Sequence, residues 1–123
     1  MISLIFPIVL VVGAAAVGFG FDLPKALGAH PFWSDQVVLI GTPIGLILGL
    51  TSLRLPYAVR TITFLGLSAL SAIAVYWGKT AFAASFAENV IAGRVWYYGW
   101  ICLITFSAAL LLSVAKRKKR LPR

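Results

Sequence analysis

Four side chains in this sequence are of the types that carry acid–base or metal chemistry: Asp22, His30, Asp35 and Glu88. Carboxylates and an imidazole that converge beside a cation such as Lys79 could form a hydrolytic or metal site. Their spacing does not enforce such convergence, and the helical His-Glu-x-x-His pattern that holds zinc is absent. The sequence therefore predicts no catalytic residue, no metal site and no cofactor. Ligation of a metal, haem or pigment by His30 stays open as an alternative.

A second group of candidate residues is aromatic and surrounds a single arginine. Indole and phenol rings favour the boundary between hydrocarbon and lipid headgroups, and a guanidinium can pair with a phosphate or lie over a ring. We therefore expect these residues to anchor the chain at a membrane interface. The alternative is a rim that binds a flat apolar ligand such as a quinone or a carotenoid. The expected anchors are Trp33, Trp77, Arg94, Trp96, Tyr97, Tyr98 and Trp100.

The elements that position these residues are long and apolar. Hydrophobic residues make up 61% of the chain, whereas soluble domains use about 45–50%. Four segments lack Asp, Glu, Lys, Arg and His, and each is near the length of about 20 residues that crosses a bilayer as a helix. We expect an all-α membrane protein, an antiparallel bundle of four transmembrane helices forming one domain over residues 1–115. The four segments are Ile2–Phe21, Val37–Leu53, Thr61–Gly78 and Val95–Ala115.

The basic residues predict the orientation of this bundle. With four spans, the side that holds both termini carries eight of the 11 Lys and Arg residues, and the other side carries Lys25, Lys79 and Arg94. Basic residues stay on the cytoplasmic side. We therefore expect a bacterial inner-membrane protein with both termini in the cytoplasm and a basic tail over residues 116–123. Six of the basic residues lie in that tail rather than on a folded face, so we do not expect nucleic acid as a partner.

The basic residues near the cytoplasmic surface are also candidate contacts for anionic headgroups or for an acidic partner protein. They are Arg54, Arg60, Lys116, Arg117, Lys118, Lys119 and Arg120.

The outer loop at residues 79–94 shows a helical pattern of its own. Phe82, Phe86 and Val90 recur every four residues, with polar side chains between them. This spacing predicts a short amphipathic helix that lies in the interface between the third and fourth spans.

Small residues form the most regular packing motif. Gly41, Gly45 and Gly49 repeat every fourth residue in the second span. Such faces let helix backbones approach closely in lipid, where little hydrophobic force drives helices together. We expect the same role for the pairs Ala14 with Gly18 in the first span and Ser68 with Ala72 in the third.

Together these patterns favour a non-catalytic, polytopic membrane subunit or scaffold. It would pack through its small-residue faces in a homo-oligomer or in a larger complex with other membrane-protein subunits. The first alternative is a passive channel or a transporter of small solutes or lipids, formed as a homo-oligomer. Its path would follow the Gly41–Gly49 face or the hydroxyl groups of the spans. A weaker alternative is a quinone- or lipid-linked membrane enzyme with its chemistry at the outer loops.

Overall fold

The computed structural model describes residues 2–26, 34–86 and 88–115, with the backbone alone for residues 2–4, 34 and 35. These residues are almost entirely helical. The elements are α1 (Ile2–Gly20), α2 (Leu23–Ala26), α3 (Ser34–Thr51), the 3-10 turn η1 (Ser52–Arg54), α4 (Tyr57–Ala84) and α5 (Val90–Ala115).

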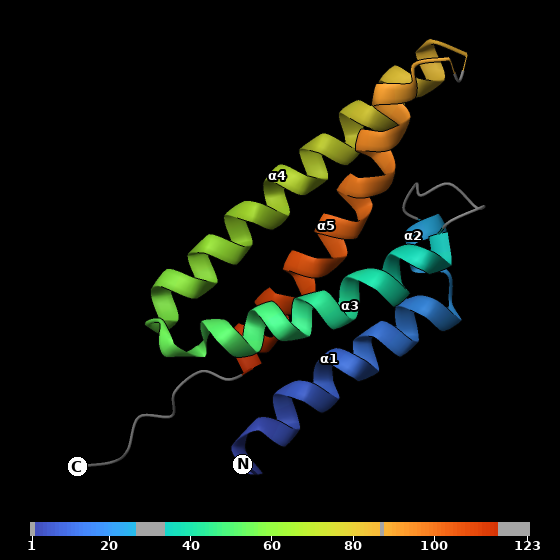
Figure 1. Ribbon diagram of the computed structural model, residues 1–123. Coiled ribbons are helices and arrows are strands. Elements are labelled where there is room, and N and C mark those ends of the chain that lie inside the picture. Colours follow the sequence, from blue (N-terminus) through green and yellow to red (C-terminus); the bar gives the residue numbers. More distant parts are fainter. Residues whose placement is uncertain (1, 27–33, 87, 116–123) are drawn as a thin grey trace.

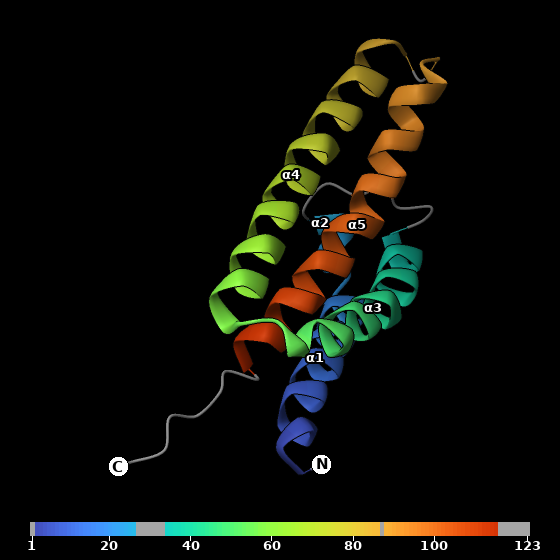
Figure 2. The ribbon, with the colours of Figure 1, turned by 60° about the vertical axis from the view of Figure 1, so that its left-hand side comes forward.

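The four long helices run alternately up and down, with α5 in the middle (Figures 1 and 2). α4 and α5 form an antiparallel hairpin that packs along its whole length, and α3 packs on α5 from another side. α1 lies outermost and makes fewer contacts, which it divides between α3 and α5. The beginning of α1, the end of α5 and η1 lie at the same end of the molecule (Figure 1).

Three helical segments are long and apolar enough to cross a membrane: Gln36–Arg54, Tyr57–Ala84 and Val90–Ala115. Between 22% and 39% of their most apolar windows is buried, so most of those side chains face outward. This is typical of a membrane protein. The apolar stretch of α1 that the structure describes, Ile5–Gly20, is shorter, so a fourth crossing stays a prediction.

α4 and α5 are longer than the sequence predicts. α4 has 28 residues and α5 has 26, which at about 1.5 Å per residue gives lengths of about 42 and 39 Å. Both exceed the hydrocarbon thickness of about 30 Å. Charged residues mark the ends of the predicted spans, but Arg60, Lys79 and Arg94 all lie inside these helices.

The prediction of a short interfacial helix between the last two spans is wrong. Residues 79–84 continue α4 and residues 90–94 begin α5. Phe86 has a left-handed backbone, with φ at 55°, which ends α4. The Ser85 hydroxyl accepts the backbone N–H of Asn89 at 2.8 Å, and the Asn89 side-chain oxygen accepts the N–H of Ala92 at 3.0 Å. These bonds satisfy free N–H groups at the start of α5 and fix a tight turn.

α4 and α5 approach each other closely at glycines. A Cβ atom added to Gly78 of α4 would lie 2.6 Å from the backbone nitrogen of Trp96, and one added to Gly99 would lie 3.0 Å from Val75. The buried face of α4 follows spacings of three and four residues, which is the spacing of a helix packed along one side. Its members are Arg60, Phe64, Ser68, Ser71, Val75 and Gly78.

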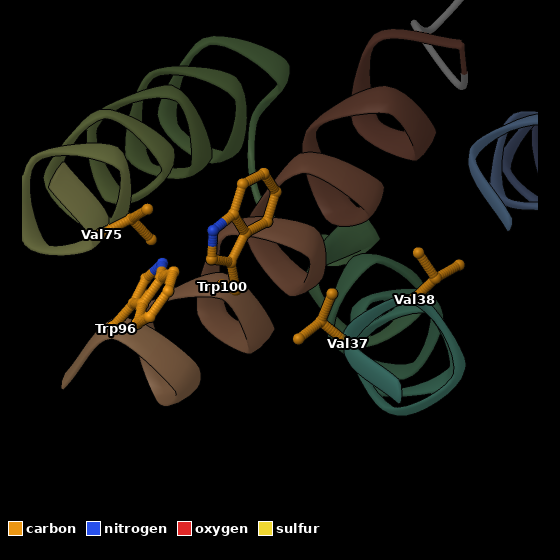
Figure 3. Close-up of a cluster of buried hydrophobic side chains, with 5 residues drawn as sticks. All are labelled: Val37, Val38, Val75, Trp96 and Trp100. Atoms are coloured by element: carbon orange, nitrogen blue, oxygen red, sulfur yellow. The ribbon is translucent and has the colours of Figure 1, made fainter. Parts of the chain in front are cut away.

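The largest buried side chains fill the space where α3, α4 and α5 meet. Trp96 and Trp100 of α5 are 8% and 4% exposed, and they pack with Val75 of α4 and with Val37 and Val38 of α3. In Figure 3, Trp100 lies between Val75 on one side and the two α3 valines on the other. A second cluster joins α1 to the far half of α5 through Val11, Ala108 and Leu112.

Candidate functional site

The acidic side chains that could do chemistry lie apart in the part of the chain that the structure describes. Asp22 lies in the turn between α1 and α2, whereas Glu88 is exposed in the turn between α4 and α5. His30 and the side chain of Asp35 lie outside the described residues. No group of three or more His, Cys, Asp or Glu side chains that could hold a metal occurs among the described residues.

Asp22 has an unusual environment. Its backbone is left-handed, with φ at 53°, and its Oδ1 atom is buried without a hydrogen-bond partner. A buried carboxylate oxygen without a donor is costly and calls for an explanation. The exposed Lys25 follows three residues later on α2.

The residues predicted to anchor the chain differ in their exposure. Trp77 and Tyr98 are 51% and 58% exposed, and Arg94 is exposed as well. Tyr97 donates a hydrogen bond from its hydroxyl to Gln36 Oε1 at 3.2 Å. The position of Trp33 lies outside the described residues.

The prediction that Trp96 and Trp100 are interfacial anchors is wrong, because both side chains are buried in the core. They lie four residues apart and so share one face of α5, the face that meets α3 and α4. The Phe82 ring packs on Trp96 with ring centroids 5.8 Å apart. The predicted rim is therefore not one surface, since two of its indoles pack inside the protein.

Arg60 also differs from the prediction of a headgroup contact. It is 5% exposed, and its guanidinium donates to Ser113 Oγ at 2.8 Å and to the carbonyl of Leu55 at 2.9 Å. Thr61 Oγ1 lies 2.9 Å from the same Ser113 hydroxyl. These bonds clamp the start of α4 to the end of α5. Arg54 is exposed, and residues 116–123 lie outside the described residues.

The glycines of α3 face α5 directly. A Cβ atom at Gly41 would lie 2.8 Å from Ile104, one at Gly45 would lie 2.5 Å from the carbonyl oxygen of Thr105, and one at Gly49 would lie 3.2 Å from Leu112. Thr105 also donates from its hydroxyl to the Gly41 carbonyl at 3.3 Å. α5 thus covers the Gly41–Gly49 face, which the channel alternative uses to line its path.

The remaining predicted packing residues have different surroundings. Ser68 is buried against the rest of the chain with no hydrogen-bond partner for its hydroxyl, whereas Ala72 is exposed. A Cβ atom at Gly18 would meet nothing within 4 Å, and Ala14 is exposed. The small residues of α1 therefore border open space.

Two apolar grooves flank α1, and sequence reasoning did not predict either of them. One, the α1/α5 groove, has a volume of about 240 Å³ and is lined by Ala14 and Gly18 on one side and by Trp100 and Ile104 on the other. The second groove, of about 480 Å³, lies between α1 and α3. The signal in the sequence was the cluster of small residues in α1, which leaves side-chain volume unfilled.

No protein-family model matches this chain, and comparisons with curated proteins and with solved structures give no match either.

Proposed function

We propose that this protein is a non-catalytic, polytopic membrane subunit. It packs through a helix face into a homo-oligomer or into a larger complex of membrane proteins.

The membrane placement is supported by the exposed apolar surface of every long helix. Phe6 of α1, Ile47 of α3, Ile62 of α4 and Ile91 of α5 are all between 64% and 69% exposed. A water-soluble monomer rarely exposes apolar side chains so widely. α1 would be the fourth crossing, since it lies alongside α3.

The orientation follows from the basic residues. Both described ends of the chain lie at one end of the molecule (Figure 1), and eight of the 11 basic residues belong to that side under the four-span arrangement. This side would face the cytoplasm of a bacterium.

The proposed contact surface is the outward face of α1. The observation that carries the proposal is that the small residues on this face are exposed. Gly13, Ala16 and Gly20 are exposed and recur at spacings of three and four residues, so they share one side of the helix. A Cβ atom at either glycine would meet nothing within 4 Å. The bundle leaves Gly13 and Gly20 uncovered and Ala16 at the edge of the groove between α1 and α3, whereas it covers the glycine face of α3. A small-residue face of this kind lets a helix of another chain approach closely in lipid.

The test is the mass of the detergent-solubilised assembly, with all copurifying chains identified. The double variant Gly13→Leu with Gly20→Leu should give a smaller assembly, because the added side chains hold the partner helix away. Gly66→Leu is the matched control, since a Cβ atom at this α4 position also meets nothing within 4 Å. An unchanged assembly in the double variant would remove α1 as the contact surface. Wild-type protein that remains monomeric without partners would contradict the proposal as a whole.

A further inference from the structure

We draw no further inference here: the strongest candidate, the apolar α1/α5 groove of about 240 Å³ lined by Ala14, Gly18, Trp100 and Ile104, carries none because nothing in the structure shows what covers it.

Discussion

Small residues recur in both α1 and α3, yet the two helices use them differently. Gly41, Gly45 and Gly49 of α3 bring its backbone against α5, with a Cβ atom at Gly45 only 2.5 Å from the Thr105 carbonyl. Gly13 and Gly18 of α1 have nothing within 4 Å of the same position. The same sequence motif therefore permits close approach without determining where it occurs.

The glycines of the two helices have different neighbours. Those of α3 meet α5 at the Thr105 backbone and Ala108 near Gly45, at Ile104 near Gly41 and at Leu112 near Gly49. α1 instead packs on α5 through the buried Val11, which lies in one cluster with Ala108 and Leu112. The two grooves are the space that this packing leaves beside the small residues of α1.

The largest expected effect is at Gly45. Gly45→Leu must displace the α5 backbone itself, since the nearest atom is the Thr105 carbonyl oxygen. We expect a loss of about 3 kcal/mol or more in the free energy of unfolding, at the upper end of the range for overpacking. The measurement is SDS-induced unfolding followed by circular dichroism.

Gly18→Leu is the comparison variant for Gly45→Leu, with the same substitution on α1. It should change the unfolding free energy by less than about 0.5 kcal/mol. If both variants lost stability equally, the structural difference between α1 and α3 would not exist in the membrane-bound protein.

The second prediction concerns the two kinds of tryptophan. Trp100 is 4% exposed in the core, whereas Trp77 is 51% exposed on α4. Trp100→Ala should cost about 3 kcal/mol through the cavity that it leaves. Trp100→Phe should cost much less, because it keeps most of the ring volume and removes an indole N–H that has no hydrogen-bond partner.

Trp77→Ala is the control, and it should leave the unfolding free energy nearly unchanged while weakening the hold on the interface. Equal losses from Trp77→Ala and Trp100→Ala would favour the original interpretation, in which both rings are anchors of the same kind.

The sequence predicted the helical class because apolar runs without charge are long enough to read directly. It failed where contacts between distant residues decide the outcome. Arg60 marked the end of a predicted span, but it lies inside α4 with its side chain buried, where Ser113, 53 positions later, accepts its N–H group. The turn between α4 and α5 was missed for a different reason. The four-residue repeat of Phe82, Phe86 and Val90 indicated a short separate helix, whereas the hydrogen bonds of Ser85 and Asn89 end one long helix and begin the next.

The candidate site was less predictable than the helices. Which aromatic rings lie inside depends on the face of α5 that meets α3 and α4, and a single sequence does not specify that face. The grooves beside α1 depend on side-chain volumes in three helices at once. The one local signal was the run of small residues at Gly13, Ala14, Ala15 and Ala16, whose lack of volume leaves space beside whichever helix packs there.

The smallest of the three losses of stability is expected for a substitution of Arg60. It tests whether the α4–α5 hairpin depends on more than its glycine contacts. Arg60 donates to Ser113 Oγ at 2.8 Å and to the Leu55 carbonyl at 2.9 Å. Arg60→Gln removes the charge and shortens the side chain, so we expect a loss of about 2 kcal/mol in unfolding free energy, the scale of hydrogen bonds to a charged group.

Arg54→Gln removes the same charge from the same end of the molecule, but Arg54 is exposed, so this variant should have almost no effect on stability. The pair therefore separates a structural clamp from a general contribution of positive charge. Equal small losses in both variants would mean that Arg60 acts as a surface charge and that the α4–α5 hairpin is held by its apolar and glycine contacts. A loss confined to Arg60→Gln would show that the guanidinium fixes one end of this hairpin, whose other end has the close approach at Gly78.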